Sequence, residues 1–463
     1  MKGRVEKKLH PNDEPLDCDE HIHYPAQIES LPIEILAEIF EAGVSTKATH
    51  GTLPFQCAIS GVNRRWRAIA VSTPRLWSTI LFHCDRRSVG SNVDRLYLWI
   101  KRSAPCALDI TIVAPPLFMY GYNMALVIDH IILHADRWHR LTIKDVSGPI
   151  VSSVIESLCT VSAPRLQHFD LSVLPDHGQI THIHDNIFTG GAAALTSARM
   201  VGLGKVCTPP LVGLTALHFG GTFRTAGSIQ LIHDEFRDLL TASPSLADLA
   251  LEAIELWPSP GTSTSNVHIP SLRTLSMNFA HCTDSFVQIF TLLSMPILET
   301  LRLAHMTTNH MTLFSEMDVP QYAALHTLKL FRCSHFGDYY NEPLDNFFST
   351  FSSVAHLYLI STANFILEPT QTQRIPWPNL KSVTILPEVV PDIIQTRKAS
   401  GHPITTAYVP RECLLSDEIM WTHMREDVEV LEVNDVSDSV EYPGGLDHCM
   451  MEEHHSNSDY DYV

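Results

Sequence analysis

The chain has 463 residues and 45% of them are apolar, so it can bury a large core and is not disordered as a whole. Its formal charge of −19, with no stripe of Lys and Arg interleaved with aromatic residues, argues against a nucleic-acid-binding protein, because an acidic surface repels phosphates. Ten cysteines fall singly without a CxxC pair, which favours reduced thiols in a cytoplasmic or nuclear protein.

The N-terminal residues 1–28 read as a disordered segment, without an apolar stretch that could serve as a signal peptide. The following SLPIEILAEIF, residues 30–40, predicts a helix that begins near Pro32, with Glu34 facing its positive end. Its apolar residues spread over an arc of about 200° when they are placed 100° apart. One buried face does not need so wide an arc, so the second apolar face requires its own explanation.

Residues 57–82 predict a second helix and the start of another segment after it. In CAISGVNRRWRAIAVSTPRLWSTILF, the residues Ile59, Val62, Trp66 and Ile69 follow helical spacing, and Pro74 ends the helix. Residues 29–82 are therefore expected to form one small helical domain.

A transition segment, residues 83–137, starts the next part of the chain, with a helix expected near 93–102 and a strand near 107–113. Its uncharged run at 110–128 is long enough to raise the question of a membrane span. Pro115, Pro116 and Gly121 interrupt that run, which favours a strand, a turn and a helix instead.

One pattern, an apolar residue at its first, fourth and sixth positions, recurs through residues 138–410. From Leu246 onward the repeats start 26, 26, 27, 29 and 26 residues apart, and a fixed period of this length is typical of a solenoid. The pattern begins at Leu166, Leu214, Leu246, Leu272, Leu298, Leu325, Val354 and Leu380, and in weaker form at Trp138 and Leu195.

Each repeat predicts a short half-buried strand, because its fourth and sixth positions alternate with polar neighbours. An apolar helical pattern usually precedes it, and a proline two residues before the first apolar position ends the helix or fixes the turn, as at Pro244 and Pro296. We expect eight to ten parallel strands stacked in one curved sheet, with Leu301 and Leu328 fully buried.

The last segment, residues 411–463, is strongly acidic. It carries fifteen acidic and two basic residues, a net charge of −13 that leaves −6 for the rest of the chain. We expect disorder from about residue 437 onward, since no periodic apolar set occurs there.

The repeats resemble the leucine-rich repeat family in an irregular form. In regular members an Asn or Cys follows the third apolar position by three residues; Cys333 fits this pattern, whereas Ala280, Met306 and Thr222 do not. The resemblance implies an α/β fold in which a small helical head precedes an irregular leucine-rich-repeat solenoid, a curved parallel sheet with helices on the convex side.

Residues 29–82 resemble an F-box, and the last, decaying repeat, with RKASGHPITTAYV at residues 397–409, resembles the large, divergent F-box sets of mushroom-forming fungi. The matching residues are Leu31, Pro32, Glu34, Leu36, Ile39, Phe40, Val62, Arg64, Trp66, Arg67, Ile69, Ala70, Pro74, Leu76 and Trp77. The resemblance implies a substrate-recruiting subunit of a Skp-cullin-F-box type ubiquitin ligase, in which the second apolar face binds a Skp-type adaptor and, through it, a cullin. It implies adaptor-binding roles for Leu31, Pro32, Ile35 and Ile39, and a core of Leu36, Phe40, Val62, Trp66, Ile69, Leu76 and Trp77.

Outward strand positions of the repeats would bind the recruited protein target, because repeat surfaces contact their partners through such positions. The candidate residues have mixed charge and polarity, which favours a protein surface over a lipid or a phosphate-rich ligand. They are Arg273, Thr274, Glu299, Thr300, His326, Thr327, Lys329, His356 and Lys381.

Two other functions remain open at this point. The chain is a stand-alone interaction scaffold if its N-terminal helices only cap the solenoid, or a hydrolase or transferase if an unrecognised site exists. No phosphate loop, GxSxG or HExxH motif occurs, and the closely spaced histidines at 21/23, 182/184 and 454/455 do not supply three ligands at a motif spacing. We therefore expect no enzyme, cofactor or metal, and no membrane or nucleic-acid partner.

Overall fold

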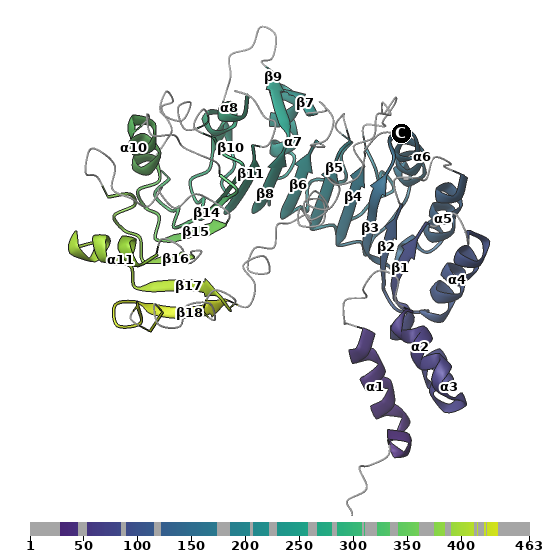
Figure 1. Cartoon of the computed structure of the whole chain (residues 1–463). Helices are drawn as coiled ribbons and strands as arrows, with labels where there is room; N and C mark the ends of the chain where they lie inside the picture. The colour runs from purple at the N-terminus through teal and green to yellow at the C-terminus, as the bar shows by residue number, and fades with distance from the viewer. Residues whose placement is uncertain are drawn as a thin grey trace, which may run out of the picture. The chain divides into compact units, whose positions relative to one another are not determined.

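A computed structural model gives the fold of the chain (Figure 1). It divides into two compact units, Met1–Leu76 and Trp77–Val463. The residues that the structure describes are 28–44, 53–84, 89–114, 122–173, 186–203, 207–221, 229–257, 266–279, 285–307, 310, 322–333, 341–360, 375–384, 390–411, 414, 421–422 and 424–433. Of the expected disordered segment 1–28, residues 1–27 lie outside these residues, whereas Ile28 begins a 3-10 turn. The expected disorder from residue 437 and the closely spaced histidine pairs also lie outside them.

The first unit is helical. A 3-10 turn, Ile28–Ser30, precedes three helices, α1 (Ile33–Val44), α2 (Phe55–Val62) and α3 (Arg64–Ser72), and a second 3-10 turn, Pro74–Trp77, follows them. The sequence predicted one helix through 59–69, but the chain breaks at Asn63, which is extended (φ −154°, ψ 176°). The Asn63 side chain caps α3 by accepting a 2.8 Å hydrogen bond from the backbone N–H of Trp66, and this satisfies a donor that a helix start leaves free.

The second unit is built on one parallel sheet (Figure 1). Its fourteen described strands lie side by side in chain order. Its strands, in spatial order, are β1 (Thr79–His83), β2 (Leu108–Val113), β3 (Trp138–Val146), β4 (His168–Val173), β5 (Ser197–Val201), β6 (Ala216–Gly220), β8 (Asp248–Glu252), β11 (Thr274–Asn278), β13 (Thr300–Ala304), β14 (Thr327–Phe331), β15 (His356–Ile360), β16 (Ser382–Thr384), β17 (Thr406–Pro410) and β18 (Glu429–Val433). The predicted parallel stacking of the repeat strands is confirmed.

Helices and short strands fill the connections between these strands. The helices α4, α5, α6, α8, α10 and α11 lie along one side of the sheet (Figure 1). The connecting elements are α4 (Val89–Arg102), α5 (Tyr122–Ile132), a 3-10 turn (Ala135–Arg137), α6 (Gly148–Cys159), β7 (Ile229–Ile232), α7 (His233–Thr241), β9 (Ile254–Trp257), β10 (Val267–His268), α8 (Ser285–Leu292), β12 (Leu293–Ser294), α10 (Asn341–Thr350) and α11 (Val390–Ala399). Strands β7 and β9, and β10 and β12, form two small parallel ladders.

Register across the sheet places the repeated apolar positions in two continuous rows. The fourth position of one repeat pairs with the fourth position of the next, as Leu275, Leu301 and Leu328 do, and the sixth positions pair in the same way. Leu301 and Leu328 are both fully buried, as predicted. The alternation of side chains along a strand sends the intervening positions to the opposite face of the sheet. We call this the helix-free face, because no described helix of the second unit lies on it (Figure 1).

The prolines of the repeats lie in a turn that recurs before the strands of the repeats. The N–H of Leu298 donates to the carbonyl of Met295 at 3.2 Å across Pro296, and the N–H of Leu246 donates to Ser243 at 3.1 Å across Pro244. Proline fits the second position of such a turn because its φ is fixed near the required value. The turn buries the first leucine of each repeat and delivers the chain into the strand two residues later.

The sheet is longer than the eight to ten strands that the repeats predict. It begins at β1, before residue 138, and it ends at β18, within the acidic segment 411–463. These terminal strands lack the full repeat spacing, so the periodicity could not identify them. Trp421, which is 1% exposed, anchors the chain just before β18.

Candidate functional site

Helix α1 carries two different apolar faces. Leu36 and Phe40 are buried at 0% and 1% exposure, whereas Ile33, Ile35 and Ile39 are 55%, 43% and 43% exposed. Before the helix, Leu31 is half-buried and Pro32 is exposed. A cluster of large exposed aliphatic residues on one short helix is typical of a surface that a protein partner covers.

The buried face of α1 packs on α2 and α3. The rings of Phe40 and Trp66 lie 5.0 Å apart, centroid to centroid, and Ile69 is 3% exposed. The guanidinium of Arg65 donates a 2.5 Å hydrogen bond to the carbonyl of Leu31 and so ties α3 to the segment before α1. The exposed residues of α1 are therefore presented from a helix that its other face holds in place.

The assignment of two residues, Val62 and Trp77, to this helical core is wrong. Val62 is 58% exposed, because the break at Asn63 turns it away from the face that a continuous helix would bury. Trp77 is buried but belongs to the second unit, where its ring meets that of Trp99 at 5.8 Å and the Arg102 guanidinium lies 4.5 Å from its centroid. Leu76 is fully buried at the end of the first unit, and Trp66 is half-buried.

The sequence did not assign every buried residue of the helical unit to its core. Ala70 and Gln56 are buried, at 0% and 5% exposure, and Ile59 is 5% exposed. Ala70 offers no signal because an alanine fits either face of a helix, and Gln56 is polar. Only the position of the break between α2 and α3 decides which of these residues point inward.

The candidate target-binding residues lie in, or directly before, the strands β11 and β13–β16, in adjacent rows. Thr274, Thr300, Thr327 and His356 pair in register across β11, β13, β14 and β15. Arg273, Glu299, His326 and Lys381 each stand one residue before a strand, and Arg273 forms an ion pair with Glu299.

Histidines in these rows are hydrogen-bonded or stacked. The Nδ1 of His356 lies 2.7 Å from the Ser382 hydroxyl, and the ring of His326 meets that of His356 edge-on at 6.2 Å. Burial and the nearby His326 and Lys381 lower the pKa of His356. At neutral pH this histidine is therefore an uncharged polar group.

Further along the helix-free face, the register brings together several polar residues, of which sequence analysis named only Lys329. The middle position of each strand forms a row that includes Asp170, Arg199, His218, Arg302, Lys329, Tyr358 and Tyr408. Asp170 and Arg199 form a 3.1 Å ion pair, and the Nε2 of His218 lies 2.9 Å from the buried carboxylate of Glu252. Only the register could reveal these pairs, because 29 and 34 residues separate the partners in sequence.

Burial shifts the pKa values of two side chains on this face, Asp248 and Lys329. It raises the pKa of Asp248 on β8, against the opposing effect of Arg302 and His218. It also lowers the pKa of Lys329 to about 8, and the adjacent Arg302 adds to that effect.

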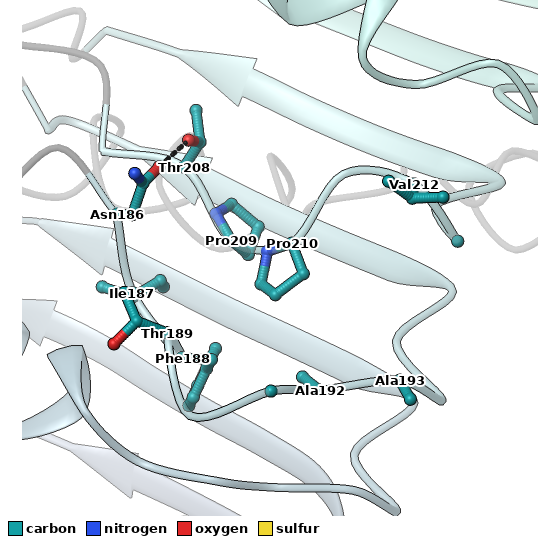
Figure 2. A pocket seen from close by; sticks show the side chains of 12 residues that line it. Asn186, Ile187, Phe188, Thr189, Ala192, Ala193, Thr208, Pro209, Pro210 and Val212 are labelled. Atoms are coloured by element: carbon teal, nitrogen blue, oxygen red, sulfur yellow. Dashed lines mark hydrogen bonds between the residues drawn. The ribbon is translucent and has the colours of Figure 1, made fainter.

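A separate hollow of about 590 Å³ lies between the loops that precede β5 and β6 (Figure 2). Its lining includes Phe188, Pro209, Pro210 and Val212, and the Thr208 hydroxyl donates a 2.8 Å hydrogen bond to the Asn186 side chain. None of the described residues that line it is charged.

Within the described part of the chain, no group of three or more His, Cys, Asp and Glu side chains could hold a metal ion. No described helix combines the length and apolarity that a membrane crossing needs.

Comparison with known families identifies one domain. Residues 28–83 match the F-box-like family, a range that contains α1, α2, α3 and the first strand of the sheet. No curated protein matches the chain. The helical unit with its exposed apolar face on α1 thus lies inside an F-box-like domain.

Proposed function

We propose that this chain is the substrate-recruiting subunit of a Skp-cullin-F-box type ubiquitin ligase, with the F-box-like domain binding a Skp-type adaptor. The observation that carries the proposal is that residues 28–83 match the F-box-like family and that α1, within this range, exposes Ile33, Ile35 and Ile39. F-box-like domains generally bind Skp-type adaptors, and an exposed aliphatic face is the chemistry that such an interface needs.

In this proposal the second unit is a leucine-rich-repeat-type solenoid that binds a protein target. The near-constant period, the repeated proline turn and the two buried rows of the sheet support it. The Sγ of Cys333 also lies 3.5 Å from the Phe331 carbonyl and 4.0 Å from that of Leu303, where the Asn or Cys of a regular repeat would bond the backbone. The chain would perform no chemistry itself and would act in the cytoplasm, the nucleus or both.

A pair of substitutions tests the adaptor-binding role. Replacing Leu31 and Pro32 with Ala should weaken binding of a purified Skp-type adaptor at least tenfold, equivalent to about 1.4 kcal/mol. Stability should change by about 1 kcal/mol or less, because Pro32 is exposed and Leu31 is half-buried. Glu38→Ala, an exposed change on the same helix, is the matched control and should leave adaptor binding within twofold.

The alternative, that the helical unit is only an end cap of the solenoid, gives the opposite pattern. The double substitution would then lower stability by about 2 kcal/mol or more, because it would open a cavity in a packed interface. Wild-type and substituted chains would bind the adaptor equally poorly. That outcome would leave a stand-alone interaction scaffold as the function.

A further inference from the structure

Three exposed arginines, Arg64, Arg65 and Arg67, lie in the first turn of α3. The N-terminus of a helix carries a partial positive charge, so cations are unfavourable there and acidic residues are the usual choice. The neighbouring helix α1 follows that preference with Glu34 in its first turn. The arginines therefore cost α3 some stability, and we expect contacts elsewhere that offset this cost.

Two of these arginines donate hydrogen bonds to backbone carbonyls of other segments. The Nε of Arg67 donates to the Ser60 carbonyl of α2 at 2.9 Å. The Nη2 of Arg65 donates to the Leu31 carbonyl at 2.5 Å, over 34 residues of sequence. Arg64, in the same turn, has no such hydrogen bond among the described residues. The contact of Arg65 is thus the one that links α3 to the chain before α1.

The direction of Arg65 follows from the cap at Asn63. This cap restarts the helix at Arg64, and in the restarted helix Trp66 lies against Phe40 of α1 with 5.0 Å between the ring centroids. Arg65, one residue before Trp66, reaches the segment that precedes α1. Helix α3 therefore contacts α1 through an aromatic pair and the chain before it through a guanidinium.

The five residues before α1, which we call the lead-in segment, are residues 28–32. The N–H of Leu36 donates to the Pro32 carbonyl at 3.1 Å, and the Leu31 carbonyl, one residue earlier, accepts from Arg65 instead. A guanidinium donates a charge-assisted hydrogen bond in a direction that its planar group fixes. Because Pro32 is exposed and Leu31 is half-buried, this bond helps to hold a segment that has little burial of its own.

We infer that Arg65 is a positioning residue for adaptor binding: it holds the lead-in segment in the conformation in which Leu31 and Pro32 meet the adaptor. The inference rests on the proposed function and deepens it. A segment that is fixed before binding loses less conformational freedom when the complex forms, which strengthens the complex. In this role Arg65 acts through Leu31 and Pro32 and not through its own contact with the adaptor.

Isothermal titration of the full chain with a purified Skp-type adaptor tests this role. Arg65→Gln should weaken binding at least fivefold. The matched control is Arg64→Gln, which removes the same charge from the same exposed turn and should leave binding within twofold. An equal loss in the two variants would show that only net charge matters and would overturn the role.

A double-mutant cycle separates positioning from direct contact. In a chain that already carries Leu31→Ala and Pro32→Ala, Arg65→Gln should weaken adaptor binding by less than a further twofold, because the side chains through which it acts are absent. A full fivefold loss in that background would show that Arg65 contacts the adaptor independently, and the positioning role would be overturned.

Hydrogen exchange of the free chain examines the same contact without the adaptor. Peptides that cover residues 28–36 should exchange at least threefold faster in Arg65→Gln than in the wild type or Arg64→Gln, whereas α2 and α3 should stay within twofold. Unchanged exchange at 28–36, or an equal acceleration in α2 and α3, would overturn the role, because the segment would then not depend on Arg65 specifically.

These results distinguish the inference from the proposed function. If the wild-type chain bound no adaptor, the proposed function would fail, and the role of Arg65 with it. If the wild-type chain bound the adaptor and Arg65→Gln bound it equally well, only the role of Arg65 would fail.

Discussion

Adjacent residues of α1, Ile35 and Leu36, offer a sharp test of how the helical unit divides its apolar surface. Each substitution by Ala removes three carbon atoms from the same helix, but Leu36 is fully buried and Ile35 is 43% exposed. At about 0.8 kcal/mol for each buried CH₂, Leu36→Ala loses about 2.4 kcal/mol of transfer free energy, and the cavity raises the cost to about 2–5 kcal/mol.

For Ile35→Ala the cost should be about 1 kcal/mol or less. Part of the removed surface already faces solvent, no closed cavity forms, and alanine gains a few tenths of a kcal/mol in helix propensity over isoleucine. The two variants should therefore differ by at least about 1 kcal/mol in the stability of the helical unit, although they remove nearly the same volume.

Hydrogen exchange of the full chain measures this difference locally. Peptides that cover α2 and α3 should exchange at least roughly thirtyfold faster in Leu36→Ala than in the wild type, which corresponds to about 2 kcal/mol, and only a few-fold faster in Ile35→Ala. Equal acceleration in the two variants would refute the reasoning, because it would show that the exposed face of α1 contributes to the fold as much as the buried face does.

Two further outcomes are expected. Leu301→Ala should lower the free energy of unfolding by about 2–5 kcal/mol, whereas Thr300→Ala on the opposite face should cost about 1 kcal/mol or less; similar losses in chemical denaturation would contradict the two-faced sheet. Removing residues 437–463 should leave the melting temperature nearly unchanged, and a fall of several degrees would show that this segment packs on the rest.

The repeats predicted much of the sheet because their physical signal is strong. Each repeat has apolar residues at the same three positions. In one repeat these are Leu298, Leu301 and Leu303, and the structure buries all three completely. The sequence also predicted the elements of the transition segment, since the expected helix near 93–102 and strand near 107–113 correspond to α4 and β2. Short alternating strands and amphipathic helices leave this trace in a single sequence.

The remaining features depend on tertiary register, which a single sequence does not encode locally. β18 was missed because its residues, EVLEV, do not keep the repeat spacing, and it pairs with β17 only through the stacked sheet. Lys329 was assigned to the target-binding face, but Arg302 and Tyr358 were not; their proximity follows from strand pairing over 27 and 29 residues. Val62 was misplaced because the cap at Asn63 restarts the helix and shifts its period.

The affinity of the wild-type chain for a purified Skp-type adaptor tests the proposed ligase role most directly. Isothermal titration should give a dissociation constant of about 1 μM or tighter, equivalent to about −8 kcal/mol, and the complex should then retain a cullin. Absence of adaptor binding at micromolar concentrations, with the helical unit folded by hydrogen exchange, would contradict the proposal.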